Sequence, residues 1–374
     1  MTKAKVLKKR LLEAHTIAAR FITGKEYQAI FNFIRVSIRD DKVILCGMDG
    51  RLYIERTIDP DGVKVISNEG QTDVLVPPDT FKKVISSDPS NELVLEIANN
   101  ALTIIGKGKF TLHGNIDVDD YWDLKDSPTT IEVPWETLRR GLERASHFVS
   151  DYNDRFATYG ARIKISGGKL SITSTDLSAV VEGVADCGVD AELDVIIPAV
   201  GIEALSSIAE KIVLTLDEGL LRYETGLIRG DVTTLVGEYP RVEPLLDSIE
   251  PQATATLCVQ DLLDSSRRIQ LLGEPSTPIV YTVGDDKLEI KTKDASKGSA
   301  SIALECKTVG RFKATVNPLY VINFLRNVLE SRKKQVHFSL SKTLSNNVMP
   351  ITMVVENDSM NYRYLAMPQE SSCI

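Results

Sequence analysis

The chain has few side chains arranged for catalysis. Histidine is the commonest metal ligand and proton carrier in proteins. No second histidine or cysteine lies at helical spacing from any of the four histidines, which are His15, His113, His147 and His337. The motifs GxSxG and HExxH are absent, and SGGKL at 166–170 lacks the flanking residues of a phosphate-binding loop. We therefore interpret SGGKL as a hairpin turn and expect no enzyme activity.

One acidic cluster has the side chains for binding a divalent cation. The segment NIDVDDYWD at 115–123 contains four aspartates, whose oxygens suit Mg²⁺ or Ca²⁺: Asp117, Asp119, Asp120 and Asp123. The segment lies where a linker between domains is expected, however. We therefore predict neither a metal site nor a cofactor.

The composition is typical of a soluble globular protein. Of the 374 residues, 43% are hydrophobic and 26% are charged. No apolar run approaches the roughly 20 residues of a membrane-spanning helix, and the first residues lack an apolar signal core. The five cysteines are scattered without a CxxC pair. We expect a reduced, cytoplasmic protein without membrane contact, and its length predicts roughly two or three domains.

Two helical patterns recur along the chain. LKKRLLEA at 7–14 and LRRGLERA at 138–145 place Leu, Leu and Ala at the same steps, and DLLDSSRRIQLL at 261–272 is a weaker copy. Apolar residues follow four and seven positions after each of three prolines, Pro77, Pro198 and Pro318. Proline suits the first turn of a helix, so each proline predicts a helix start. The spacing of about 120 residues indicates three structural repeats.

Between the predicted helices, apolar and polar residues alternate as they do in β-strands. The segment ARIKISGGKLSITSTD at 161–176 is typical of a strand, a Gly-Gly turn and a second strand. Counterparts occur at 35–49 and at 280–294. The three segments each end on an aspartate, namely Asp49, Asp176 and Asp294.

The repeated order of elements predicts an α+β fold. Each repeat is expected to place two helices on one face of its own antiparallel sheet. Polar segments containing proline, at 123–133 and 246–256, indicate the domain boundaries. The predicted domains cover residues 1–125, 126–249 and 250–374.

The charges are distributed unevenly. The net charge of −8 by itself argues against a nucleic-acid-binding protein, because phosphate affinity comes from Lys and Arg. Six predicted helices nevertheless carry +9 together, which leaves −17 for the rest of the chain. These helices are Lys3–Arg20, Pro78–Ser87, Trp135–His147, Ala199–Lys211, Asp261–Gln270 and Pro318–Lys334. Either the helices share a positive face, or their cations merely cover solvated surfaces.

Three segments of the chain are distinctive: STDLSAVVEG at 174–183, VGEYPRVEPLL at 236–246 and YLAMP at 364–368. They are similar to a Thr-Asp turn, a Gly-x-aromatic-Pro loop and a terminal apolar-Met-Pro sequence of one family. With these segments in place, the whole chain resembles the bacterial DNA polymerase III beta sliding clamp family. The resemblance implies three clamp-type domains with antiparallel sheets outside and two helices per domain inside.

The resemblance also implies an assembly and partners. Family members close into a head-to-tail homodimeric ring around double-stranded DNA, independently of its sequence, and perform no chemistry. They tether the replicative DNA polymerase, the clamp loader and repair proteins through short apolar peptides. The alternative is a clamp-fold scaffold for protein–protein contacts that does not encircle DNA.

Three sets of site residues follow from the resemblance and from the helix charges. The partner-peptide cleft would comprise Thr175, Leu177, Ser178, Val180, Pro240, Leu245, Met349, Pro350, Leu365, Met367 and Pro368. DNA would contact Lys8, Lys9, Lys25, Arg139, Arg140, Arg144, Arg155, Arg267, Arg268, Arg326 and Lys333. The dimer interface would join Phe110 and Leu112 to Leu271 and Leu272 of a second copy.

Two departures from the family pattern bear on these sites. The second-repeat helix, PAVGIEALSSIAE, has no basic residue before Lys211, where family members usually carry several. The family cleft commonly has a basic residue after Thr-Asp-Gly, whereas this chain has TDLSAVV at 175–181. We therefore expect weaker DNA contact at that helix and an altered preference for peptides.

Overall fold

The structure is a computed structural model. It describes residues 1–20, 22, 28–114, 118, 121, 124, 131–150, 156–206, 212–217, 219–294, 296–329, 334–341, 350–356 and 360–368. The chain forms two compact units, Met1–Glu132 with Glu210–Thr233, and Val133–Ala209 with Thr234–Ile374. Strands pair antiparallel in both units, which confirms the predicted α+β fold class. Among the described residues, none of the helices has the length and apolar character needed to span a bilayer.

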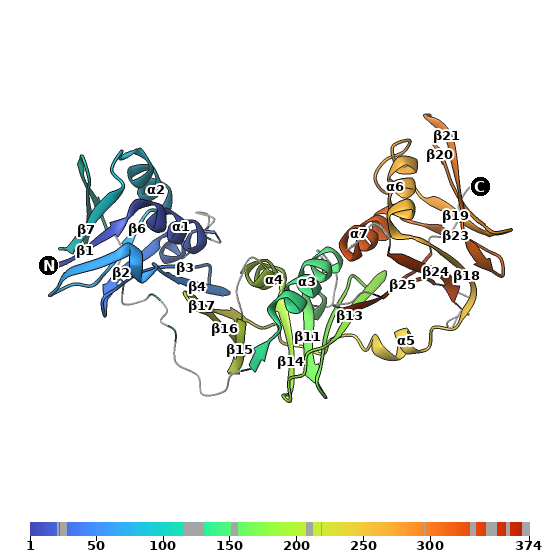
Figure 1. Ribbon diagram of the computed structural model, residues 1–374, viewed down its shortest axis with the longest axis horizontal. Helices are drawn as coiled ribbons and strands as arrows, with labels where there is room; N and C mark the ends of the chain where they lie inside the picture. Colours follow the sequence, from blue (N-terminus) through green and yellow to red (C-terminus); the bar gives the residue numbers. More distant parts are fainter. Residues whose placement is uncertain are drawn as a thin grey trace. The chain divides into compact units, whose positions relative to one another are not determined.

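The first unit is built on two antiparallel sheets (Figure 1). The five-stranded sheet has the order β5 (Val63–Asn68), β1 (Thr2–Leu7), β7 (Glu92–Ala98), β8 (Ala101–Ile105) and β9 (Lys109–His113). The eight-stranded sheet has the order β10 (Ile131–Val133), β15 (Ile212–Asp217), β16 (Leu220–Thr225), β17 (Ile228–Thr233), β4 (Leu52–Thr57), β3 (Lys42–Met48), β2 (Ile34–Arg39) and β6 (Asp73–Val76).

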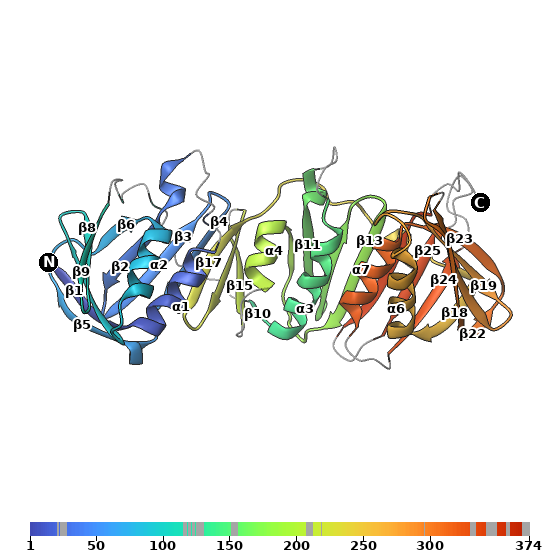
Figure 2. The same cartoon turned by 90° about the horizontal axis from the view of Figure 1, so that it is seen from above.

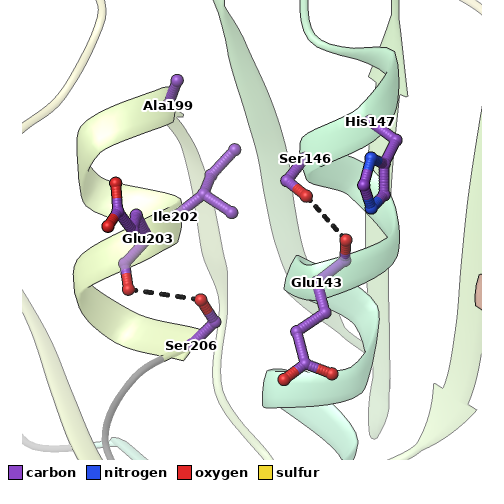
Figure 3. Close-up of a pocket in the computed structure, with 7 residues that line it drawn as sticks. All are labelled: Glu143, Ser146, His147, Ala199, Ile202, Glu203 and Ser206. Carbon is purple, nitrogen blue, oxygen red and sulfur yellow. Dashed lines mark hydrogen bonds between the residues drawn. The ribbon is translucent and has the colours of Figure 1, made fainter.

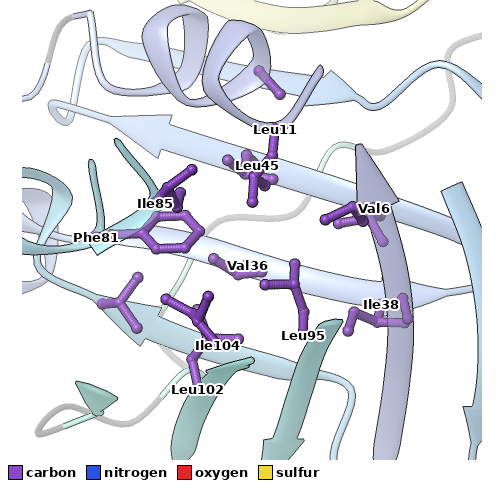
Figure 4. Close-up of a cluster of buried hydrophobic side chains, with 14 of the residues drawn as sticks. Val6, Leu11, Val36, Ile38, Leu45, Phe81, Ile85, Leu95, Leu102 and Ile104 are labelled. Carbon is purple, nitrogen blue, oxygen red and sulfur yellow. The ribbon is translucent and has the colours of Figure 1, made fainter. Parts of the chain in front are cut away.

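Two helices and both sheets enclose the core of the first unit. Helix α1 (Lys8–Ala18) packs against α2 (Pro78–Ser87), which begins after Pro77 as predicted. Leu11 of α1 and Phe81 of α2 point into the same apolar cluster as strand side chains such as Leu95 (Figure 4). Short 3₁₀ turns at Ala29–Asn32 and Pro60–Gly62 complete the described part of this unit. Its core is therefore formed by the apolar faces of two helices packed against two sheets.

The first helix begins later than predicted, because a strand precedes it. Ala4 and Val6 are buried and alternate with Lys3 and Lys5, a period of two that specifies a strand. Lys3 and Lys5 form ion pairs with glutamates of the neighbouring strand β7. The prediction of a helix from Lys3 was therefore wrong.

The corrected helix bounds reduce the helical charge. The six predicted helices are observed as α1, α2, α3 (Trp135–Ala145), α4 (Ala199–Ser206), α6 (Val259–Gln270) and α7 (Pro318–Val328). Within these bounds they contain eleven Lys and Arg and seven Asp and Glu, a net charge of +4. The sequence analysis predicted +9, and most of the difference arises because Lys3, Lys5, Arg20 and Lys334 lie outside the observed helices. The other charged residues of the predicted helices that these bounds leave out are outside the described residues.

The second unit is also built on two sheets. The nine-stranded sheet has the order β14 (Leu193–Pro198), β11 (Gly160–Ser166), β12 (Lys169–Thr175), β13 (Ala179–Asp186), β26 (Asn361–Ala366), β25 (Ile351–Val355), β24 (Gln335–Ser341), β18 (Pro251–Cys258) and β22 (Lys307–Val309). The four-stranded sheet has the order β21 (Gly298–Glu305), β20 (Lys287–Asp294), β19 (Ile279–Gly284) and β23 (Phe312–Val316). Helix α3 lies beside α4, and α6 lies beside α7 (Figure 2). The short helix α5 (Glu243–Asp247) packs against β26.

Two sheets join strands from different repeats. Strand β17 pairs with β4 in the first unit, and β13 pairs with β26 in the second unit. The sequence analysis predicted a separate sheet for each repeat, which is wrong. Its periodicity located individual strands, but the pairing of two edge strands distant in sequence leaves no local pattern. The domain boundaries near 125 and 249 stay a prediction.

The three predicted aspartate turns share one geometry. One Oδ1 oxygen of Asp49, Asp176 and Asp294 accepts hydrogen bonds from the backbone N–H groups two and three residues further on, at 2.8–2.9 Å. Aspartate favours such turns because its short side chain reaches its own backbone. The recurrence of this turn after β3, β12 and β20 supports the threefold repeat predicted from the sequence.

A buried histidine makes the stability of the first unit depend on pH. His15 of α1 lies against Phe81, and its Nε2 is 2.8 Å from the carbonyl oxygen of Pro78. Burial lowers the pKa of His15 below its ordinary value. The unfolded chain therefore binds a proton that the folded chain resists, and folding free energy is lost as pH falls below about 6.5.

We predict that His15→Gln reduces this loss, because glutamine keeps an N–H donor for Pro78 but does not titrate. Urea denaturation at about pH 7.5 and about pH 5.5 measures the effect as a smaller difference in unfolding free energy. His113→Gln, at an exposed position, controls for the removal of one histidine. An unchanged pH dependence in His15→Gln would contradict the assignment.

Candidate functional site

An apolar cluster lies where β13 and β26 run side by side. Val180 of β13 is opposite Leu365 of β26, and the Met367 N–H donates to the Ser178 carbonyl at 2.9 Å. The cluster, which we call the β13–β26 site, consists of Val180, Leu245, Leu365 and Met367 together with Val242, Leu246 and Ile249. Strand β26 and the residue after it therefore place a buried leucine, Leu365, and a half-buried methionine, Met367, next to the turn after β12.

Two arginines of the sheet form ion pairs with α5 and hold it against the sheet. Arg363 of β26 donates to Glu182 at 2.8 Å and to Asp247 of α5 at 2.6 Å. At the other end of α5, Arg162 of β11 donates to Glu243 at 2.7 Å. Charge-assisted hydrogen bonds of this kind fix geometry as well as adding energy. The apolar residues of α5 are thereby held against Leu365.

The turn after β12 forms the edge of the β13–β26 site. Thr175 is buried, and its hydroxyl donates to the Ala179 carbonyl at 2.7 Å. Leu177, two residues after Thr175, is 44% exposed. The second carboxylate oxygen of Asp176 accepts from the Tyr320 hydroxyl of α7 at 2.8 Å. The turn is thus attached to both its own strand and a helix of the last repeat.

The structure places the predicted cleft residues in one region, with one outside the described residues. Pro350 is buried immediately before β25, whose Ile351 is opposite Ala366 of β26. Pro240 follows Tyr239, whose hydroxyl donates to the Thr173 carbonyl at 3.2 Å. Pro368 follows Met367 and is half-buried, while Met349 is outside the described residues.

The sequence analysis missed four residues of this region. Val242, Leu246 and Ile249 belong to the cluster, and Tyr320 supports the turn. The spacing of Val242, Leu246 and Ile249 is helical, which is the signal that predicts a short amphipathic helix there. The hydrogen bond from Tyr320 has no sequence signal, because its partner is distant in the chain.

The cations of α1 and α2 differ in their availability. The Lys8 ammonium donates to the carbonyl oxygens of Ser86 and Asp88 at the end of α2, where a cation also stabilises the helix dipole. Lys9 is exposed, as are Lys82 and Lys83 of α2, which were not among the predicted contacts. Lys25 is outside the described residues.

The arginines of α3 are engaged locally. Arg139 donates to Glu136 at 2.7 Å and also to Glu143, and Arg140 donates to Glu136 at 3.0 Å. The hydrogen bond from Arg139 is the main reason that the pKa of Glu136 falls to about 2. Arg144 is buried, with its guanidinium 4.7 Å from the centre of the Tyr362 ring. Arg144 is therefore a packing residue here.

A hollow of about 520 Å³ lies between α3 and α4 and has an acidic lining (Figure 3). The carboxylates of Glu143 and Glu203 border it, together with His147, Ser146 and Ser206. Burial lowers the pKa of His147, and nearby Arg326 lowers it further, which favours the neutral ring. Helix α4 has one glutamate and no Lys or Arg within its bounds. This sector of the helices disfavours phosphate.

The remaining predicted DNA contacts lie on α6 and α7 or outside the described residues. Arg268 and Arg326 are exposed, and Arg267 is 4.0 Å from Asp264. Arg155 and Lys333 are outside the described residues. The four aspartates of the acidic linker are outside them as well, and within the described residues no group of His, Cys, Asp and Glu could hold a metal ion.

Each unit exposes an apolar residue that was predicted for the dimer interface. In the first unit it lies on an edge strand, and in the second unit it lies at a helix end. Phe110 lies on β9, the last strand of the five-stranded sheet, and is 46% exposed. Leu112 of the same strand packs on the core. Leu271, which follows α6, is 84% exposed, and Leu272 is half-buried. The predicted interface set therefore consists of two exposed and two packed residues.

Comparisons with known proteins agree with this geometry. Residues 2–125 match the family described as DNA polymerase III beta subunit, N-terminal domain. The beta sliding clamp of Bacillus subtilis is 23% identical over 356 residues, which cover 89% of this chain and 92% of that protein. The beta sliding clamp of Streptococcus pneumoniae R6 is 24% identical, and the match covers 96% of this chain and 97% of that protein. The chain is thus similar to beta sliding clamps over nearly its whole length.

Solved structures of sliding clamps have the same fold. The Bacillus subtilis DNA polymerase sliding clamp superposes with a TM-score of 0.89 at 19% identity, covering 99% of both chains. The DNA polymerase III beta chain of Streptococcus pneumoniae TIGR4 superposes with a TM-score of 0.88 at 21% identity, covering 99% of this chain and 100% of that one. The clamp fold therefore extends over both units of this chain.

We predict that Arg363→Met destabilises the second unit by about 3 kcal/mol, because it leaves Glu182 as a buried carboxylate without its partner. The Glu182 side chain is only 4% exposed. Arg241→Met is the matched control, since Arg241 is 82% exposed and its pair with Glu238 contributes little. Urea denaturation compares the two variants. Equal unfolding midpoints for Arg363→Met and the wild type would contradict the role of this ion pair.

Proposed function

We propose that this protein is a DNA sliding clamp, a non-catalytic processivity factor that encircles duplex DNA as a homodimeric ring. The observation that carries the proposal is the repeated pair of helices packed on antiparallel sheets, in a fold that superposes on a sliding clamp over 99% of the chain. Full-length relatives named beta sliding clamps support it. The protein would act in the cytoplasm without a cofactor.

The helix charges suit loose contact with DNA. Exposed ion pairs such as Arg139–Glu136 contribute only about 0–1 kcal/mol, so a phosphate can replace the carboxylate at little cost. A closed ring retains DNA by topology, and sliding favours weak, salt-sensitive contacts with phosphates over contacts with bases. Lys9, Lys82 and Arg268, which are exposed, are the leading candidates for such contacts. Sequence-independent binding follows from this chemistry.

Ring closure would use two different surfaces of the chain. Strand β9 is an open edge in the first unit, and β21 is an open edge in the second unit. Phe110 on β9 and Leu271 after α6 add exposed apolar area. A contact between two unlike patches is heterologous, and it closes into a ring when the rotation allows. Such a contact also covers edge strands that would otherwise invite aggregation.

The β13–β26 site would bind the partners of the ring. Leu245, Ile249 and Met367 are half-buried over a buried base. With Leu177 exposed beside them, they suit a short peptide with a few apolar anchors. Methionine such as Met367 adapts to several ligands because its side chain repacks easily. The expected partners are the replicative DNA polymerase, the clamp loader and repair proteins.

The test of encirclement is retention on DNA. The protein, loaded on a nicked circular plasmid by its clamp loader, should remain bound in gel filtration until the circle is linearised. Phe110→Asp should be monomeric by light scattering and should not be retained, because it places a charge in the dimer contact. Ile66→Asp changes an exposed residue at the opposite edge of the same sheet and is the control. If the protein dissociates equally from circular and linear DNA, the encirclement proposal fails and the scaffold alternative remains.

A second test concerns the acidic sector of the helices. Glu203→Lys replaces the one charge of α4 with a cation, so duplex DNA should bind more tightly. The slope of log affinity against log salt should steepen by about one unit, as expected for one added phosphate contact. Fluorescence anisotropy measures both quantities. Glu238→Lys makes the same charge change in an exposed loop, and equal effects of the two variants would contradict a DNA-facing α4.

A further inference from the structure

Leu177 adopts a backbone conformation that is unfavourable for leucine. Its φ angle is +71°, in the left-handed region where a Cβ atom meets the following carbonyl. The same turn occurs in the first repeat, and there the residue after the aspartate is Gly50, with φ +84°. Glycine adopts this conformation without the steric penalty. The second repeat therefore has a strained leucine where the first repeat has an unstrained glycine.

Three side chains hold Leu177 in this conformation. The Thr175 hydroxyl oxygen accepts from the Leu177 N–H at 3.0 Å, and Asp176 accepts from the next two N–H groups. Tyr320 of α7 donates its hydroxyl to the other oxygen of Asp176. Burial and the nearby Asp176 raise the pKa of Tyr320 to about 12, so it remains a donor at neutral pH. Hydrogen bonds from the second and third repeats thus hold Leu177 in its strained conformation.

The support keeps an apolar side chain in contact with solvent. Leu177 is 44% exposed, although most leucines of this chain are in its cores. Its neighbour Ser178 accepts the hydrogen bond from Met367, so Leu177 lies at the open end of the β13–β26 pairing. Strain that is maintained by surrounding hydrogen bonds, with no gain in burial, is typical of functional positions.

We propose that Leu177 is a specificity-determining residue of the β13–β26 site, which selects peptides with an apolar side chain at the position facing this turn. The ligand class is a short segment of a partner protein in which an aliphatic or aromatic residue packs on Leu177. This inference rests on the proposed function, because it assumes that the β13–β26 site binds partner peptides. Tyr320 and Asp176 act through Leu177 and are positioning residues.

Two substitutions separate the side chain from the conformation. Leu177→Gly removes the side chain and the strain together. Leu177→Asn keeps a side chain of similar size, and asparagine tolerates the left-handed region, but it replaces apolar atoms with polar ones. Both variants should fold, and Leu177→Gly should lose no thermal stability, because the relieved strain offsets the lost contacts.

The probe is the tightest binder among overlapping short peptides that cover the replicative polymerase. In fluorescence anisotropy, Leu177→Gly and Leu177→Asn should each bind it about five- to tenfold more weakly, as expected for losing part of one buried leucine. Alanine at the apolar peptide residue that faces the turn should weaken binding to the wild type more than to Leu177→Gly. Unchanged affinities with intact binding would overturn the inference and leave the peptide site standing.

Tyr320→Phe tests the positioning role. It removes the hydrogen bond to Asp176, so peptide affinity should fall in the wild-type background. It should cause no further loss in the Leu177→Gly background, because glycine needs no support in this turn. An equal loss in both backgrounds would overturn the positioning role. If no polymerase peptide binds the wild type, the proposed peptide site fails, and the inference fails with it.

Discussion

The pairing of β13 with β26 is the interaction on which the second unit depends. It joins a strand of the middle repeat to β26, the last strand that the structure describes, with Val180 opposite Leu365. The same register places Glu182 opposite Arg363, so the buried carboxylate meets its guanidinium partner. A slip of one residue would reverse every side chain of the strand and separate both pairs. The register of this strand pair therefore positions both the apolar cluster and Arg363, which binds α5.

Local patterns predicted most elements of the fold, but not how they pair. Helical spacing located α3, α6 and α7, and the Gly-Gly turn after β11 has φ values of +57° and +76° at Gly167 and Gly168. The alternation of Ala4 and Val6 was obscured by the helix pattern that follows it. Cross-repeat pairing left no signal, because hydrogen bonds between distant edge strands depend on packing rather than on local residue order.

The candidate site was predicted from resemblance more than from physics. Matching segments located the turn at Thr175 and the tail at Met367, and the structure brings them together. The charge argument was less accurate, because Lys3 and Lys5 belong to a strand and Arg144 is buried on Tyr362. Burial decides whether a cation is available to a phosphate, and the sequence alone does not give burial.

The placement of β17 beside β4 has a consequence for dissecting this protein. Strand β17 lies between β16 and β4 in a sheet to which the first third of the chain contributes β2, β3, β4 and β6. A recombinant fragment ending at residue 125 would expose the backbone of β4 along its length, a template for intermolecular strand addition. Autonomous expression of that segment is therefore expected to give inclusion bodies unless the missing strand is supplied in trans.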